Sequence, residues 1–327
     1  MAQYITKRAL LMIPTLFIIS IITFIIIQLP PGDFVSTMVA NSAAQGQTVD
    51  SAEIQALRAR YGLGEPLYQQ YFTWITGILR GDLGFSYTFN EPANSLIVGR
   101  LGFTLVISFA ALLMTWAIAF PIGIYSAVHK YSPADYAFTL IGFLGLAIPD
   151  FLLALIMMYI AYKYFGQSVG GLFSEQYIGA PWSLDKFVDM LGHIWIPMII
   201  IGAAGTAGLI RILRANLLDE LFKPYVITAR SKGVAERKLI LKYPVRIALN
   251  PFISTVGWIL PALFSGETIV GVVLSLPTIG PLLLNALKAQ DMYLAGSIIL
   301  ILSVLTVIGT LLSDILLAWN DPRIRLQ

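Results

Sequence analysis

Six long apolar runs constrain the fold of this chain more than any other feature of its sequence. Each is close to or longer than the roughly 20 residues that an α-helix needs to cross about 30 Å of hydrocarbon. The runs cover residues 9–29, 101–128, 136–165, 194–212, 251–276 and 294–319. None alternates apolar and polar residues as a barrel strand does, and within lipid a helix is the other structure that satisfies its own backbone polar groups. We therefore predict an all-α polytopic membrane protein with six transmembrane helices.

The composition also excludes a water-soluble fold. Hydrophobic residues make up 57% of the 327 residues and charged residues 12%, and the mean hydropathy is +0.78. A soluble domain carries about twice that share of charge. Lys7 and Arg8 precede the first run as in a signal peptide, but the run is longer than a usual signal core and lacks a small-x-small cleavage pattern before Pro30. We expect residues 1–29 to be retained as a first helix.

The sequence offers no catalytic, cofactor or metal site. It contains no cysteine, which excludes disulfides, thiolate metal sites and cysteine nucleophiles. His129 and His193 lie far apart at the ends of runs without ligand spacing, so we expect neither metal binding nor acid–base chemistry from them. The absence of a Gly-Lys dipeptide excludes a Walker A phosphate loop. The chain is therefore predicted not to be an enzyme, and any ATP must be hydrolysed by another chain.

Basic residues predict the side of the membrane on which each loop lies, because short loops rich in Lys and Arg stay in the cytoplasm. Residues 211–246 hold nine basic and three acidic residues. This segment, and with it both termini, should be cytoplasmic, while residues 30–100, 166–193 and 277–293 should lie outside. We therefore attribute the net charge of +3 to membrane topology, and it does not predict nucleic-acid binding.

These signals divide the chain into three parts. Residues 1–29 hold the first helix, residues 30–100 form a long outer loop, and residues 101–327 form the transmembrane core with a cytoplasmic loop at about 213–250. Within the long loop, residues 41–50 are small and polar as in a flexible link, whereas 53–60 and 66–79 have helical periodicity. The loop could be a packed surface or a docking platform for a partner.

Residues 224–249 predict two short helices separated by a glycine turn. Pro224 suits the first turn of a helix, and Gly233 suits the position after its end, where a positive φ is common. Residues 235–249 can form a second helix before the next run. The result would be an exposed knob (residues 224–249), although a solvated basic loop would also explain the charges.

Residues 225–234, with the sequence Tyr-Val-Ile-Thr-Ala-Arg-Ser-Lys-Gly-Val, resemble the cytoplasmic loop of permease subunits of ATP-binding-cassette importers, in the branch that takes up dipeptides and oligopeptides. Further motifs extend the resemblance over nearly the whole chain. They are Leu63-Gly64-Glu65-Pro66-Leu67, Gly81-Asp82-Leu83-Gly84-Phe85-Ser86, Ile148-Pro149-Asp150-Phe151, Ala248-Leu249-Asn250-Pro251 and Asp321-Pro322-Arg323-Ile324-Arg325. No single motif is specific, but jointly they are.

The resemblance implies a type I importer permease fold in the bacterial cytoplasmic (inner) membrane. It implies as partners a second homologous permease, two ATPase subunits that bind ATP and Mg, and an extracytoplasmic solute-binding protein, all working within the lipid bilayer. In such importers the cytoplasmic loop is a coupling helix seated in a groove of an ATPase subunit. The residues that this assigns to coupling or to shaping the loop are Thr228, Ala229, Arg230, Lys232 and Gly233.

The fifth run departs from the family pattern. Gly271 stands where the branch usually has a glutamate, and Glu267 places a carboxylate four residues earlier, about 5.4 Å away along a helix axis. The polarity of the transport path can therefore differ from that of peptide carriers. We expect dipeptides or oligopeptides as cargo, with oligosaccharides or another small solute as the alternative.

Asp150 in the third run and Glu267 in the fifth are the candidates for the translocation path. Carboxylates inside a membrane are costly and usually face a protein interior or a water path. A structural hydrogen bond would also explain either residue, and Asp150 could support a kink at Pro149. An ion-coupled secondary transporter using both acids is a rival reading, but no internal repeat is visible. An intramembrane hydrolase would need a Ser or metal constellation that neither histidine could serve.

Gly202, Gly205 and Gly208 recur at three-residue spacing in the fourth run. Small residues let helices approach closely, so this pattern predicts a packing seam, either within the chain or with a second permease.

Overall fold

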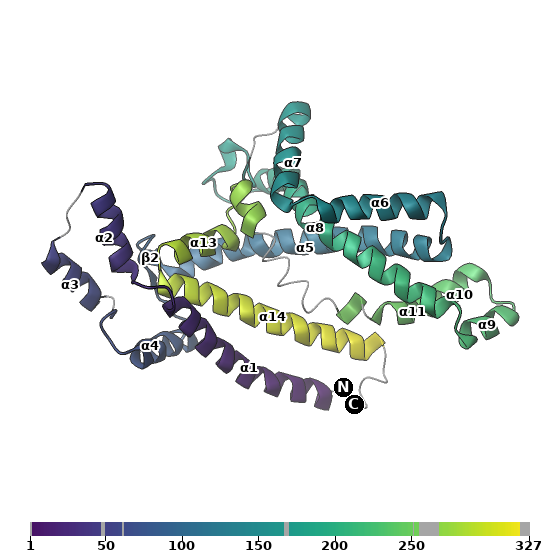
Figure 1. Cartoon of the computed structure of the whole chain (residues 1–327), viewed down its shortest axis with the longest axis horizontal. Helices are drawn as coiled ribbons and strands as arrows, with labels where there is room; N and C mark the ends of the chain where they lie inside the picture. Colours follow the sequence, from purple (N-terminus) through teal and green to yellow (C-terminus); the bar gives the residue numbers. More distant parts are fainter. Residues whose placement is uncertain are drawn as a thin grey trace. The chain divides into compact units, whose positions relative to one another are not determined.

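The computed structural model describes residues 2–46, 50–60, 62–166, 170–250, 252–254 and 268–320. Within these residues, four helices are long and apolar enough to cross a membrane: α1 (Ala2–Gln28), α5 (Ala93–Val128), α8 (Leu184–Leu221) and α14 (Met292–Asn320) (Figure 1). They coincide with the first, second, fourth and sixth apolar runs, which confirms a helical, multi-pass chain. The fifth run lies mostly outside the described residues, of which 252–254 and 268–273 are helical.

The third run is not the single continuous helix that its length predicts. It forms α6 (Pro133–Ala147) and α7 (Asp150–Phe165), which are bent by 104° relative to each other. The break lies at Ile148, whose φ of −81° and ψ of 121° are extended. Proline disfavours the helical conformation of the residue before it, and Pro149 follows directly. The pair is either one broken span or a re-entrant segment.

The chain forms two compact units, of which unit 1 comprises residues 1–8, 104–277 and 308–327. In it α6, α7 and α11 (Pro244–Ala248) pack against α8. A short 3-10 helix, η1 (Glu175–Tyr177), precedes α8, and α9 (Pro224–Ser231) and α10 (Glu236–Lys242) follow it. The buried core joins α5, α8 and the short helices through Ala119, Ala127, Leu209, Leu213, Leu217, Val226, Ala229, Leu239, Ile240, Val245, Ala248 and Phe252.

The predicted glycine seam lies between α8 and α5. A Cβ added at Gly202 would come within 2.4 Å of Met114 Cε, and Thr115 Oγ1 donates a hydrogen bond of 3.2 Å to the Gly202 carbonyl. Gly205 makes only ordinary contact with Thr115, and Gly208 has nothing within 4 Å among the described neighbours. The close approach therefore depends on Gly202.

Unit 2 comprises residues 9–103 and 278–307. The long loop contributes α2 (Phe34–Ala44), α3 (Ser51–Arg60) and α4 (Leu67–Leu79), then strands β1 (Phe85–Ser86) and β2 (Glu91–Pro92), and α13 (Ile279–Lys288) precedes α14. The strands pair antiparallel, with Phe85 opposite Pro92 and Ser86 opposite Glu91. The helices expected at 53–60 and 66–79 are confirmed. The link expected at 41–50 is wrong in its first part, because α2 continues to Ala44, and 47–49 lie outside the described residues.

Buried polar contacts hold the long loop on the first turns of α14. The fully buried Asp291 carboxylate accepts hydrogen bonds from Ser86 Oγ at 2.6 Å and from the Thr88 N–H at 3.1 Å. Trp74 Nε1 donates to Ser297 Oγ at 3.4 Å. Unpaired buried polar groups are costly, so these contacts fix the position of the loop within unit 2. Two buried apolar clusters accompany them in unit 2. One consists of Phe24, Trp74, Met292 and Leu300, and the other of Ala93, Ile97, Ile279, Leu282, Ala286, Leu294, Ala295 and Ile298.

Candidate functional site

The knob contains the first helix and the glycine turn that the sequence predicts. The single second helix expected at 235–249 is wrong, because this segment forms α10 and α11, which are separated at Tyr243 before Pro244. Pro224 is the first residue of α9, where a missing N–H costs nothing. Thr228 Oγ1 donates to the Pro224 carbonyl at 2.9 Å. Gly233 follows with a φ of +73°, and its N–H donates to the Arg230 carbonyl at 3.0 Å. Because residues with a Cβ rarely adopt this conformation, glycine sets the direction in which the chain leaves α9.

An ion pair closes the turn from α9 to α10. Arg230 donates to Glu236 from Nε at 3.0 Å and from a terminal nitrogen at 2.6 Å, a two-pronged geometry that fixes both side chains. The hydrogen bond from Arg230 holds the pKa of Glu236 below its ordinary value. Both side chains are about half exposed, so the pair contributes more to the shape of the turn than to stability.

The five residues assigned to coupling divide between the surface and the core. Thr228, Arg230, Lys232 and Gly233 are exposed and close together at the end of α9. Ala229 is only 9% exposed and belongs to the buried cluster that includes residues of α8. Ala229 is therefore placed to anchor α9 against α8 and has little surface to offer a partner.

A buried ion pair connects α8 to the start of α6. Arg214 donates to the Asp135 carboxylate from Nε at 2.9 Å and from a terminal nitrogen at 2.8 Å. Asp135 is 2% exposed and also accepts the Tyr131 N–H at 2.9 Å. Ser132 caps α6 by accepting the Asp135 N–H at 3.2 Å. This pair lies on the part of α8 that leads into the knob.

Of the two candidate path residues, only Asp150 lies within the described residues. Asp150 is the half-buried first residue of α7, directly after the break at Pro149. A carboxylate in the first turn of a helix is favoured by the positive end of the helix dipole. Glu267 lies outside the described residues, so the path-lining role of Asp150 and Glu267 stays a prediction.

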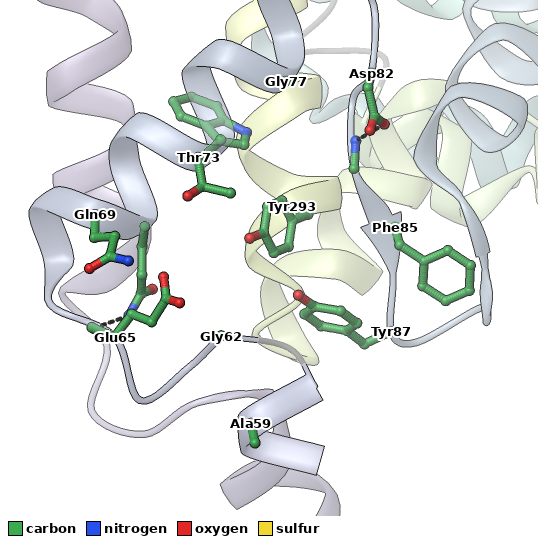
Figure 2. Close-up of a pocket in the computed structure, with 13 residues that line it drawn as sticks. Ala59, Gly62, Glu65, Gln69, Thr73, Gly77, Asp82, Phe85, Tyr87 and Tyr293 are labelled. Carbon is green, nitrogen blue, oxygen red and sulfur yellow. Dashed lines mark hydrogen bonds between the residues drawn. The ribbon is translucent and has the colours of Figure 1, made fainter. Parts of the chain in front are cut away.

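A cavity of about 550 Å³ lies within unit 2 (Figure 2). The end of α3, the turn before α4, α4 itself, β1 and the first turn of α14 all contribute to its walls. Figure 2 shows the Tyr293 and Tyr87 side chains between Glu65 and Asp82 in this view. The residues that line it are Ala59, Gly62, Glu65, Gln69, Gln70, Thr73, Trp74, Gly77, Asp82, Gly84, Phe85, Tyr87 and Tyr293.

Known families match nearly the whole chain. Residues 119–326 match the family described as binding-protein-dependent transport system inner membrane component, and residues 1–109 match the description of its N-terminal part. The chain belongs to this family of inner-membrane transport components. The permease is therefore a multi-pass subunit of an ATP-binding-cassette transporter, as the knob sequence predicts.

Relatives of this permease align over almost their full length. It is 33% identical over 326 residues to the oligopeptide transport system permease protein AppB of Bacillus subtilis, with 99% of both chains covered. It is 28% identical over 342 residues to the dipeptide permease DppB of Escherichia coli K12, and 31% identical over 327 residues to the glutathione permease GsiC of an E. coli O6:H1 strain. Each of these alignments also covers 99% of both chains.

The structure of this permease adds residues that the sequence reasoning missed. Asp135 pairs with Arg214 on α8 before the knob, Glu236 pairs with Arg230 within the knob, and Tyr225 donates its hydroxyl to Glu220. A local signal existed only for Asp135, which stands three residues after Ser132 as in a helix-capping motif.

Proposed function

We propose that this chain is a transmembrane permease subunit of an ATP-driven, binding-protein-dependent importer of dipeptides or oligopeptides. The observation that carries the proposal is the full-length match to permeases named for oligopeptide, dipeptide and glutathione transport. The knob supports it independently, because a subunit without its own phosphate loop must receive motion from another chain through a rigid contact.

Coupling follows from how α9 is held. Val226 and Ala229 bury one side of α9 in the core that includes Leu213 and Leu217 of α8. If an ATPase subunit binds the exposed end of α9 and moves it, α8 would move as well, because packed cores shift as units and do not deform continuously. In this role Thr228, Arg230 and Lys232 touch the ATPase, while Ala229 and Gly233 shape the loop.

The basic segment 211–246 supports a cytoplasmic knob, with both termini on the same side of the inner membrane. Six spans of a type I importer permease result if the bent pair α6 and α7 forms one span and the fifth run another. A second, homologous permease completes the path, two ATPase subunits bind ATP and Mg below it, and an extracytoplasmic binding protein delivers the cargo.

Asp150 and Glu267 supply polar groups to the path in this proposal, because intramembrane carboxylates usually face water or a protein interior. Asp150→Asn and Glu267→Gln should each reduce peptide uptake at unchanged membrane abundance. Normal uptake by both variants would refute a path-lining role.

The test of coupling uses the complete importer in proteoliposomes. Gly233→Pro should leave the permease in the membrane but abolish cargo-stimulated ATP hydrolysis, since proline is fixed at a φ near −65° and cannot adopt +73°. Gly179→Pro is the matched control, because Gly179 has a φ of +75° and, like Gly233, nothing within 4 Å of an added Cβ. Stimulation that survives Gly233→Pro, or that is lost equally in both variants, would contradict the proposal.

A further inference from the structure

The described walls of the cavity in unit 2 contain acidic residues and no basic ones. Among the described residues that line it, Glu65 and Asp82 are acidic and none is Lys, Arg or His. The nearby Arg58 is turned to other partners, since it bonds Ser36 Oγ at 3.1 Å and pairs with Asp33 at 3.3 Å. The cavity is therefore a negative site that is open to the surface of unit 2.

Both carboxylates have acceptor capacity left. Glu65 is held by its backbone: its N–H donates to the Gly62 carbonyl at 3.2 Å, and its carbonyl accepts from Gln70 Nε2 at 2.8 Å. Its carboxylate is exposed and is bonded by no side chain in the described part of the chain. Asp82 accepts the Gly84 N–H through Oδ1 at 2.9 Å, which leaves its second oxygen available to a ligand.

Aromatic rings form the wall of the cavity between these two carboxylates. Tyr293 lies directly against Gly84, where a Cβ would come within 2.7 Å of the ring. Tyr87 meets Tyr293 edge to face, with centroids 5.7 Å apart and an interplanar angle of 89°. Trp74 is 3% exposed and fixed by its contact with Ser297, so it forms a rigid part of the wall. Figure 2 shows the Tyr293 hydroxyl directed into the open space.

Carboxylates beside aromatic rings are the combination that binds organic cations, through charge-assisted hydrogen bonds and the negative faces of the rings. An anion would be repelled by the two acids. A metal ion is disfavoured, because the described residues include no group of three or more His, Cys, Asp or Glu that could hold one. The remaining chemistry is that of an ammonium or guanidinium group.

We propose that the cavity in unit 2 is a subsite for a primary ammonium or guanidinium group. The subsite is occupied by this group while cargo is delivered. The cation has two possible sources, the free amine of a peptide cargo and a Lys or Arg side chain of the extracytoplasmic binding protein. Its use in delivery rests on the proposed function, whereas cation binding itself does not.

Cation binding is tested on the purified full-length chain in lipid nanodiscs. The probe is N-acetyl-trilysine amide, and the comparator is the same peptide with its side-chain amines acetylated. Only the charged peptide should bind, and the double variant Glu65→Gln/Asp82→Asn should weaken its affinity by roughly tenfold or more, because charge-assisted hydrogen bonds are lost. Glu91→Gln removes an exposed carboxylate elsewhere in unit 2 and should leave the affinity unchanged. Absent binding, equal binding of both peptides, or equal affinity in the double variant would overturn the proposal.

The complete importer then identifies the source of the cation. The concentration of binding protein that gives half-maximal ATP hydrolysis is measured with a free-amine dipeptide and with its N-acetylated form. If the cation belongs to the binding protein, the double variant should raise this concentration for both cargoes. If the cation belongs to the cargo, the double variant should raise it only for the free-amine dipeptide. Equal values for parent and double variant with both cargoes would overturn the role in delivery. A parent that shows no stimulation contradicts the proposed function, while the peptide-binding result still decides the cation site.

Discussion

The buried ion pair between Asp135 and Arg214 is expected to be the strongest polar contact between α6 and α8. Two hydrogen bonds of 2.9 and 2.8 Å join the charged groups, and Asp135 is almost fully buried. Asp135→Asn keeps the shape of the side chain and an oxygen for the Tyr131 N–H, so it removes the charge with little loss of packing. The variant leaves Arg214 without a counter-charge.

The magnitude follows from the burial of the two partners. Breaking a fully buried pair costs about 3–5 kcal/mol, but Arg214 is 27% exposed and water can solvate part of its charge. We therefore expect a loss of roughly 2 kcal/mol, which corresponds to a fall in melting temperature of roughly 3 °C for a chain of this size. Because Arg214 lies on the segment of α8 that leads to the knob, cargo-stimulated ATP hydrolysis should fall as well.

The assay is a double-mutant cycle in detergent, with unfolding followed by tryptophan fluorescence. Asp135→Asn, Arg214→Gln and the double variant are compared with the parent, and the double variant should lose less than the sum of the two single losses. The equivalent cycle on Arg230 and Glu236, which have the same two-pronged geometry but are about half exposed, should give a smaller coupling. Additive losses at Asp135 and Arg214, or equal coupling in both cycles, would refute the reasoning.

Three further variants test other parts of the structure. Gly84→Ala should lower the melting temperature, because an added Cβ would come within 2.7 Å of Tyr293 and Gly84 has a φ of +85°; an unchanged melting temperature would contradict this packing. Glu236→Gln should lower stability near neutral pH but not at acid pH. Arg230 depresses the pKa of Glu236 in the folded state, so the carboxylate stabilises the fold above its unfolded pKa and loses that effect as the pH falls through its folded pKa. A difference in melting temperature that does not depend on pH would contradict this. Asp291→Ala should destabilise by about 2 kcal/mol in urea unfolding, since its buried donors lose their acceptor, and a change below measurement error would argue against that contact.

The sequence predicted the long helices, α9 and its glycine turn correctly because these depend on local signals. Run length and apolar composition set α1, α5, α8 and α14, since a helix in lipid needs no partner to satisfy its backbone. Pro224 and Gly233 mark the two ends of α9 through their backbone preferences alone.

The break in the third run could not be predicted from proline alone. Pro14, Pro121 and Pro197 lie inside α1, α5 and α8 without ending them, whereas Pro149 separates two helices. Neighbouring helices and local adjustments can satisfy the carbonyl that a proline leaves free, so the outcome depends on tertiary contacts that the sequence does not display.

The contacts that shape the candidate sites are long-range, which is why they were missed. Arg214 was counted among the basic residues that orient the chain, yet its partner Asp135 lies 79 positions away. The cavity likewise joins residues from the long loop to Tyr293. Sequence reasoning also grouped Ala229 with the neighbouring residues that couple to the ATPase. Only its burial in the structure shows that it anchors α9 and has little surface for contact with a partner.

Unit 2 is assembled from two segments that leave the ribosome at very different times. Its first segment ends at residue 103 and its second begins at residue 278, and at 5–20 residues per second the interval lasts roughly 10–35 s. Until then Ser86 and Trp74 have neither Asp291 nor Ser297 to bond. The newly translated long loop therefore stays incompletely folded until the second segment of unit 2 has been translated. During this interval it is most exposed to proteases and chaperones.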